Sequence, residues 1–232
     1  MSGYKRLENS KKRVKMAKSE SSEGGQIGSK KQLAVLLSKL KGFEGPKVRA
    51  EQYTTDPEIA AEVLWAAFMN EDIGKVSVDL GCGPGILGIG LLVLGAERVY
   101  FVDFDKDALE TAKNNLEKAK SECKVLGEAV WVLDDVANFN EKAGLVVQNP
   151  PFGVKVRNAD RLFLKKAFEV GDTVYSFHKS EGKQFIDTFS RENKFRITNI
   201  MDFNFPLKAT MSYHSRRIKR INVSCFRMER VS

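Results

Sequence analysis

The sequence predicts an α/β protein with a seven-stranded, mostly parallel sheet, helices on both faces of the sheet and an antiparallel hairpin at its C-terminal end. Two observations predict this fold. From residue 75 onward, short apolar runs alternate with helical patterns, and such alternation is typical of parallel strands joined by helical crossovers. The last two apolar runs, at 195–205 and 221–228, have no helix between them. We therefore expect these two strands to pair antiparallel.

The N-terminal part of the chain differs from the α/β part. Residues 1–28 contain few apolar side chains and cannot bury enough surface to offset the entropy lost on ordering, so we expect a disordered basic arm. Residues 29–232 are expected to form a single domain. Within it, residues 29–74 make N-terminal helices and residues 75–232 make the α/β core.

Two helices are predicted before the sheet. Four leucines between positions 33 and 40 recur at the spacing of one helical face, which indicates a short helix over 30–40. Asp56 is a suitable N-cap residue and Pro57 suits the first helical position, so a second helix is expected to begin there.

The core elements then follow in order along the chain. Before the C-terminal pair, the apolar runs predict strands over 75–80, 98–103, 129–133, 145–148 and 173–178. Between them, the spacing of apolar residues predicts helices over 86–94, 107–120, 161–170 and 182–191.

The positive charge is concentrated at the two ends of the chain. The net charge is +8, and residues 1–31 hold nine Lys or Arg against three Glu. A second basic cluster lies at 214–220. This distribution favours a polyanion such as nucleic acid as partner, because phosphate contacts give sequence-independent affinity. A basic tail that is only solvated explains the charge equally well.

Composition excludes several classes of protein. No apolar run reaches the roughly 18–20 residues that a membrane span needs, and the N-terminus lacks the apolar segment of a signal peptide. We therefore expect a cytoplasmic protein, with the nucleus as a second compartment if the source is eukaryotic. The three scattered cysteines, Cys82, Cys123 and Cys225, form neither a disulfide framework nor a closed zinc site. We interpret them as packing residues and expect no metal site.

A glycine-rich turn follows the first predicted strand. The segment Asp79–Gly85 ends that strand and opens a helix, and its glycines let a ligand approach the backbone closely. A dinucleotide pattern can be written with Gly83, Gly85 and Gly88, with Asp103 as the acid 20 residues on. However, Gly88 would then lie inside the helix. The alternative is the turn of S-adenosylmethionine enzymes, in which Asp103 accepts from the ribose hydroxyls, and this turn alone leaves the cofactor open.

A second motif, Asn149-Pro150-Pro151-Phe152, follows the fourth strand. A rigid strand-ending turn would explain the prolines, because Pro donates no ladder hydrogen bond, but it does not explain the Asn and the Phe. The Asn149 side-chain oxygen and the Pro150 carbonyl can both accept from one planar NH2 group, and Phe152 offers a face for a planar ring. The motif therefore indicates a planar amide or exocyclic amine as substrate, at the carboxyl ends of the strands.

The tetrapeptide resembles a known motif of S-adenosylmethionine-dependent methyltransferases that act on exocyclic amines or glutamine amides. More narrowly, residues 30–230 are similar to the methyltransferase-like-five family of ribosomal RNA adenine-N6 methyltransferases. The stretches that carry this resemblance are Gly42–Lys47, Glu51–Thr55 with Pro57, Asp79–Gly85, Asn149–Gly153 with Lys155, and Val174–Ser180.

The resemblance implies a Rossmann-like class I methyltransferase fold that binds S-adenosylmethionine. Carried over by position, the implied cofactor residues come from the segment before the sheet, the glycine turn, the tip of the second strand and the end of the third strand. They are Gln52, Thr55, Asp79, Gly81, Gly83, Pro84, Ile86, Asp103, Asp135 and Val136. The implied catalytic residues are Asn149, Pro150, Pro151 and Phe152.

The implied reaction is N6-methylation of an adenosine in small-subunit ribosomal RNA. The base would leave its stack, lie against Phe152 and present its amine to Asn149 and Pro150. Two alternatives stay open. One is a protein-glutamine N5-methyltransferase, which uses the same tetrapeptide on an amide. The other is a non-catalytic RNA-binding or ribosome assembly factor with the same fold.

Partners and further residues follow from the same resemblance. RNA phosphates would be contacted by Lys155, Arg216, Arg217, Lys219 and Arg220, although the last four also suit a solvated hairpin tip. In this family a small zinc-binding activator protein adds a strand at the sheet edge by the third strand, and any zinc would belong to that partner. We take the run Val99–Val102 as an edge strand, although its apolar side chains fit plain core packing better, and we interpret His178 as a structural hydrogen-bonding residue.

Overall fold

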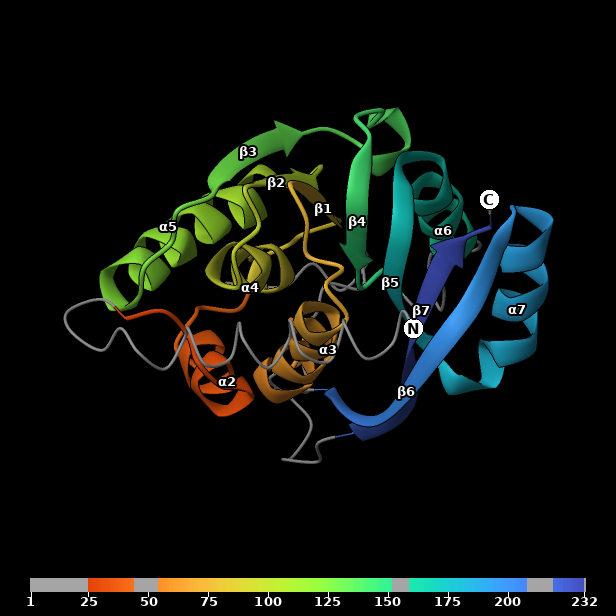
Figure 1. Ribbon diagram of the computed structural model, residues 1–232, viewed down its shortest axis with the longest axis horizontal. Coiled ribbons are helices and arrows are strands. Elements are labelled where there is room, and N and C mark those ends of the chain that lie inside the picture. Colours follow the sequence, from red (N-terminus) through yellow and green to blue (C-terminus); the bar gives the residue numbers. More distant parts are fainter. Residues whose placement is uncertain (1–24, 44–53, 152–158, 208–218, 232) are drawn as a thin grey trace, which may run out of the picture.

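A computed structural model of the protein describes residues 25–43, 54–151, 159–207 and 219–231. Its centre is one seven-stranded sheet with the strand order β3-β2-β1-β4-β5-β7-β6 (Figure 1). The first five strands run parallel, and β7 pairs antiparallel with both β5 and β6. The strands are β1 (Val76–Leu80), β2 (Arg98–Asp103), β3 (Glu128–Leu133), β4 (Ala143–Gln148), β5 (Gly171–Lys179), β6 (Phe195–Leu207) and β7 (Lys219–Arg230). The predicted sheet and its antiparallel hairpin are confirmed.

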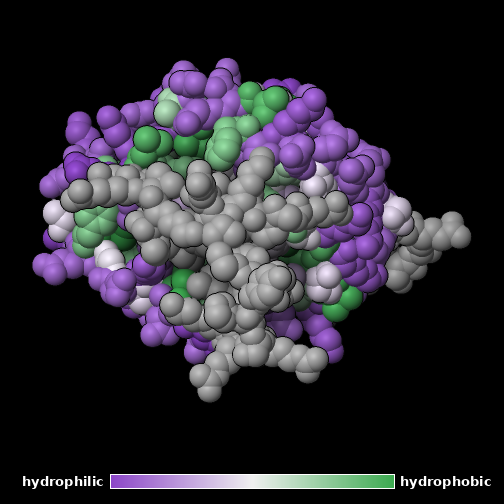
Figure 2. Space-filling view, turned by 180° about the vertical axis from the view of Figure 1, so that it is seen from behind, coloured by the Kyte–Doolittle hydropathy of each residue, from purple (hydrophilic) through white to green (hydrophobic). Residues whose placement is uncertain are grey.

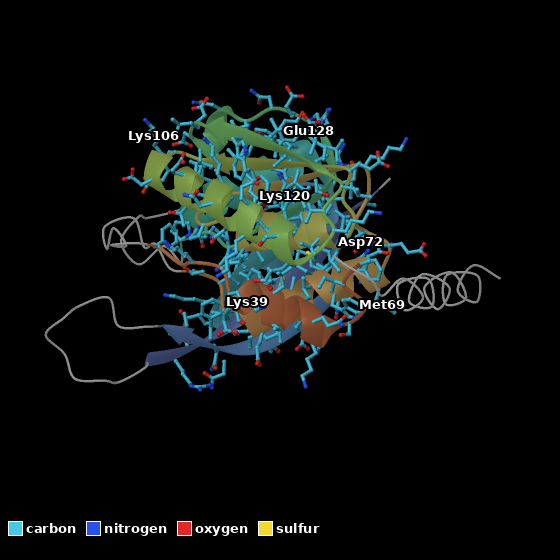
Figure 3. All side chains as sticks on the ribbon, turned by 90° about the vertical axis from the view of Figure 1, so that its left-hand side faces the viewer. Lys39, Met69, Asp72, Lys106, Lys120 and Glu128 are labelled. Atoms are coloured by element: carbon cyan, nitrogen blue, oxygen red, sulfur yellow. The ribbon has the colours of Figure 1, made fainter. Side chains whose placement is uncertain are left out.

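Helices cover both faces of the sheet, as predicted. One apolar core lies under the first four helices, and a second core lies under the last two. In Figure 3, α5 and the pair α2 and α3 lie on the same side of the molecule. The helices are α2 (Lys30–Ser38), α3 (Pro57–Met69), α4 (Ile86–Val93), α5 (Lys106–Glu122), α6 (Ala159–Val170) and α7 (Lys183–Glu192), with short 3-10 turns η2 (Val136–Asn138) and η3 (Ser180–Gly182).

Each helix before the sheet begins at a side-chain cap, and α3 begins at the predicted one. The Asp56 carboxylate accepts hydrogen bonds from the backbone N–H groups of Glu58 and Ile59, and Pro57 is the first residue of α3. The Ser29 side chain accepts from the N–H of Gln32 at the start of α2. These side chains satisfy donors that the first helical turn leaves unpaired.

The strand order brings three carboxyl ends together. Because β1 lies between β2 and β4 in parallel register, Leu80 is paired with both Val102 and Gln148. The residues that follow these three strands therefore meet at the carboxyl ends of the strands, which is where ligands bind in open α/β folds.

Two predictions about the strands are corrected. The run Val99–Val102 belongs to β2, which is an interior strand, and the open edge on this side is β3. An apolar run fits an interior strand because both of its faces are buried. Lys219 and Arg220 are the first residues of β7 rather than part of the preceding loop.

A largely buried ion pair fastens the end of α3 to the sheet. Asp72 lies just past α3, near Met69 (Figure 3), and accepts two hydrogen bonds from the Arg227 guanidinium at 2.8 and 2.7 Å. The Tyr175 hydroxyl donates to the same carboxylate at 2.7 Å. The side chains of Arg227 and Asp72 are only 10% and 8% exposed, so this pair joins α3, β5 and β7 away from water.

The remaining features concern packing and surface. Cys82, Cys123 and Cys225 are all buried and free, as packing residues should be. Among the described residues, no helix is both long and apolar enough to cross a membrane. Seen from behind, most of the coloured surface is hydrophilic, with small hydrophobic patches between (Figure 2).

Candidate functional site

The glycine turn has the backbone that its sequence predicts. Gly81, Gly83 and Gly85 have φ angles of +65°, +51° and +83°, in the left-handed region that side chains other than glycine rarely adopt. A Cβ added at Gly81 or Gly83 would also lie 2.7 or 2.6 Å from the rings of Phe163 and Phe43, respectively. Gly88 lies inside α4, so the dinucleotide pattern does not describe this turn.

Two buried carboxylates hold the turn in place. Asp79 is 1% exposed, and its Oδ2 accepts from the N–H of Gly88 at 2.7 Å. Burial raises the pKa of Asp79 to about 7. At the tip of β2, Asp103 accepts from the N–H groups of Gly83 and Asp105 at 2.8 and 2.9 Å. Burial also raises the pKa of Asp103.

The side chain of Asn149 lies at the carboxyl end of β4. Its Nδ2 donates to the Oγ1 of Thr55 at 3.0 Å. Its Oδ1 is buried and has no hydrogen-bond partner among the described residues. Such an acceptor is costly unless a ligand supplies the donor. Through the bond between Nδ2 and Oγ1, the predicted site residues Thr55 and Asn149, from segments far apart in the sequence, meet at the end of β4. Thr55 is 7% exposed and the neighbouring Pro150 is buried.

Other predicted residues take structural positions around the turn. The Pro84 carbonyl accepts from the Asn115 side chain at 2.9 Å. Ile86 and Val136 are buried in the cores on opposite faces of the sheet. Asp135 is exposed and accepts from the N–H of Ala137 at the start of η2. Five predicted site residues lie outside the described residues: Gln52, Phe152, Lys155, Arg216 and Arg217.

Asn115 is a site residue that sequence reasoning missed. Its side chain is 2% exposed and bridges α5 to two loops, because its amide donates to the carbonyls of Pro84 and Lys41 and accepts from the N–H of Lys41. The sequence signal for this residue is an amide side chain at an apolar position of an amphipathic helix. A buried amide needs a polar partner.

A buried polar chain lies beside Asn149. The Gln148 side chain donates to Ser176 Oγ at 2.9 Å, and Ser176 Oγ is 2.6 Å from His178 Nε2. Burial lowers the pKa of His178 to about 3, so its imidazole is neutral over the range in which proteins work. This contact supports the interpretation of His178 as a structural hydrogen-bonding residue.

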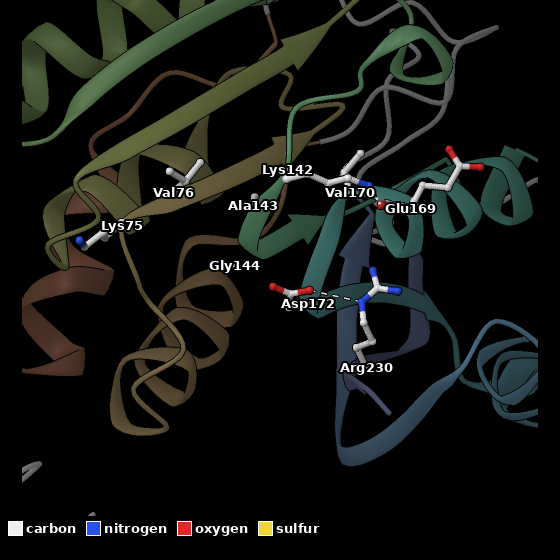
Figure 4. A pocket seen from close by; sticks show the side chains of 9 residues that line it. All are labelled: Lys75, Val76, Lys142, Ala143, Gly144, Glu169, Val170, Asp172 and Arg230. Atoms are coloured by element: carbon white, nitrogen blue, oxygen red, sulfur yellow. Dashed lines mark hydrogen bonds and ion pairs between the residues drawn. The ribbon is translucent and has the colours of Figure 1, made fainter. Parts of the chain in front are cut away.

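A shallow pocket of about 580 Å³ lies at the opposite edge of the sheet, at the starts of β1, β4 and β5 (Figure 4). Two of its three cationic side chains have protein partners. Arg230 pairs with Asp172 and donates to the Phe168 and Gly171 carbonyls, and Lys142 donates to the Glu169 carbonyl. Because it lies away from the glycine turn and Asn149, this pocket is not the predicted site.

Comparison with known proteins identifies the family. The sequence profile of the Methyltransferase small domain matches residues 54–171. The rRNA N(6)-adenosine-methyltransferase METTL5 of Danio rerio is 33% identical over 205 residues, which cover 85% of this chain and 97% of that protein. The corresponding Drosophila melanogaster enzyme is 32% identical over 86% of this chain and 95% of its own. The chain belongs to the methyltransferase-like-five family.

The fold comparison agrees with this assignment. The crystal structure of a provisionally assigned RNA methyltransferase from Pyrococcus horikoshii is 41% identical and superposes with a TM-score of 0.79, over 88% of this chain and 100% of that one. As a member of the methyltransferase-like-five family, the chain is an S-adenosylmethionine-dependent enzyme with a Rossmann-like class I methyltransferase fold.

The described residues fit that cofactor. The left-handed glycine turn lies at the end of β1, and Asp103 offers carboxylate oxygens beside it at the end of β2. Glycine backbone and an acid at the tip of the second strand are the groups that hold a nucleoside in this class of fold.

Proposed function

We propose that this enzyme methylates N6 of an adenosine in small-subunit ribosomal RNA. The observation that carries the proposal is the buried Asn149 Oδ1, which has no partner among the described residues. An exocyclic amine brought to this position would donate the missing hydrogen bond. The names of the zebrafish and fruit fly relatives support an adenosine in ribosomal RNA as the substrate.

The residues at the end of β4 would position the amine. We expect the Asn149 oxygen and the Pro150 carbonyl to accept the two N6 hydrogens, which directs the nitrogen lone pair out of the ring plane. Pro150 and Pro151 hold that carbonyl at low entropy cost. S-adenosylmethionine, when bound, supplies an electrophilic methyl group.

Positioning accounts for most of this chemistry. The amine proton becomes acidic as the new N–C bond forms, so no strong general base is required. The target base would leave its stack to reach the site, and Phe152 is proposed as the ring on which it lies. The neutral His178 keeps its structural role, because it is hydrogen-bonded within the protein.

Several basic residues are proposed to contact RNA phosphates. They are Lys155, Arg216, Arg217, Lys219 and Arg220, together with the basic arm at 1–28. Arg220 is exposed at the start of β7, which suits a phosphate contact. We place the reaction in the cytoplasm, and also in the nucleus if the source is eukaryotic.

A small zinc-binding activator protein is proposed as partner at the β3 edge. Among the described residues, no strand pairs with the outer side of β3, and Phe104 and Leu133 near its end are 62% and 55% exposed. An added strand would satisfy the free backbone groups and cover these side chains. Co-expression with such a partner should give a 1:1 complex, and replacing Leu133 by Lys should weaken it. A complex that is unaffected by this change would place the partner elsewhere.

The reaction is tested by tritiated methyl transfer from S-adenosylmethionine to purified ribosomal subunits, followed by nucleoside analysis. We expect label in N6-methyladenosine. Label in protein would instead support glutamine methylation. No label even with the activator present would support a binding or assembly factor.

The role of Asn149 is tested in the same assay. Asn149→Ala should lose more than about 2 kcal/mol of transition-state stabilisation, about 30-fold in kcat/KM, with little change in cofactor affinity. The matched control is Asn114→Ala, because Asn114 is exposed on α5. An equal loss of activity and cofactor affinity in Asn149→Ala would refute the assigned role.

A further inference from the structure

Three consecutive residues before α3 each accept hydrogen bonds from a different part of the protein. Thr54 Oγ1 accepts from the N–H of Phe43 at 3.3 Å. Thr55 Oγ1 accepts from Asn149 Nδ2 at 3.0 Å. The Asp56 carboxylate accepts from the first turn of α3. Thr55 therefore lies between two anchored neighbours: Thr54 is bonded to Phe43, whose ring lies against Gly83, and Asp56 caps α3.

The Asn149 amide can in principle face the substrate with either end. Its oxygen accepts hydrogen bonds and its NH2 group donates them, and a half-turn about the last side-chain bond exchanges the two with little change in shape. An amine on the substrate needs the oxygen. In the observed arrangement the NH2 group is directed at Thr55, and the oxygen is left without a partner among the described residues.

We propose that Thr55 is a positioning residue that holds the Asn149 amide by its NH2 group, which leaves the Asn149 oxygen available for the substrate amine. This inference rests on the proposed function, and it gives the Thr55 hydroxyl a role separate from the cofactor contact that family resemblance implies. The contact joins residues 94 positions apart in the sequence. Thr55 acts through Asn149 and does not touch the reacting atoms.

Two substitutions separate the hydroxyl from the shape of the side chain. Thr55→Val keeps the branched shape and removes the acceptor, whereas Thr55→Ser keeps the acceptor. If Thr55 positions Asn149, Thr55→Val should lower kcat about tenfold or more, because a misplaced group loses the gain from orientation. Thr55→Ser should stay within about threefold of the wild type, and calorimetry should give cofactor Kd values within about twofold for all three proteins.

A double-mutant cycle tests whether the effect passes through Asn149. In the Asn149→Ala background, Thr55→Val should cause no further loss of kcat, because the group it positions is gone. Additive losses would overturn the proposal, and so would a Thr55→Val variant with wild-type kcat. If Thr55→Val raises the cofactor Kd by the same factor by which it lowers the rate, Thr55 acts in cofactor binding instead.

A readout without substrate keeps this inference separate from the proposed reaction. The Asn149 side-chain NH2 pair, assigned by its absence in Asn149→Ala, can be followed by 15N nuclear magnetic resonance. We expect its hydrogen exchange to be slow in the wild type and in Thr55→Ser, and faster in Thr55→Val. Equal exchange in all three proteins would overturn the anchoring role. Absence of methylated RNA with wild-type enzyme and activator would count against the reaction alone.

Discussion

Asp79 is the residue whose ionisation gives the clearest prediction. Its pKa is raised by burial from an ordinary 3.8 to about 7, so the folded protein favours the protonated carboxyl. The stability that this group contributes is complete below about pH 4 and is lost as the pH rises through 7. Asp79→Asn keeps an acceptor for the Gly88 N–H and cannot ionise. Its free energy of unfolding should therefore exceed that of the wild type by up to about 4 kcal/mol at pH 8.

Urea unfolding of both proteins between pH 4 and pH 8 checks this prediction. The comparison is needed because His178 has the opposite dependence. Its pKa falls from 6.5 to about 3 on burial, so its contribution is present above pH 6.5 and is lost as the pH falls toward 3. Both proteins contain His178, so its contribution cancels when the free energies of unfolding of wild type and Asp79→Asn are subtracted at each pH. A difference that does not change with pH would contradict the raised pKa of Asp79.

The candidate site could be predicted where residues act through local chemistry. The glycines of the turn and the Asn149 tetrapeptide are recognisable from sequence because each needs a particular backbone or side chain at fixed spacing. The contact of Thr55 with Asn149 could not be predicted, because no local pattern links a hydroxyl before α3 to an amide after β4. Asn115 was missed for the same reason, since its partners are in loops distant along the chain.

At the scale of elements, the end of α3 depends on the Asp72–Arg227 pair. Asp72→Ala should lower the free energy of unfolding by about 3–5 kcal/mol, because it leaves a buried guanidinium without its main counter-charge. Thermal or urea unfolding measures the loss. The control is Glu62→Ala, which breaks a pair with Lys30 whose side chains are 52% and 50% exposed and should change stability little. Similar small effects for both variants would show that the buried pair is not a structural anchor.

Element types and the C-terminal hairpin were predictable from sequence, but the order of the parallel strands was not. The apolar runs and capping residues locate the helices and strands closely, as Asp56 and Pro57 show for α3. The run Val99–Val102 was placed at an edge although β2 is interior. Local hydrophobicity reports burial, whereas edge or interior position depends on which strands pair, and pairing is decided by the whole sheet.

For the whole molecule, the basic arm is expected to raise RNA affinity. Residues 1–28 carry seven Lys or Arg against three Glu. Removing them should weaken RNA binding and reduce the slope of log affinity against log salt by at least about 1, because fewer counterions are released. Salt titrations of binding measure this slope. A variant with the seven basic residues changed to Gln keeps the length and should match the truncation. If the slope is unchanged in both variants, the arm does not contribute to RNA binding.

The order of the strands also determines whether two macromolecules compete for this enzyme. The edge strand β3 is five strand positions from β7 in the sheet, a separation of about 24 Å at the usual interstrand spacing. On the proposed assignments, a protein added at β3 and RNA phosphates held near the start of β7 would therefore contact different strands of the sheet. We therefore expect the two proposed partners to bind together, in either order of addition.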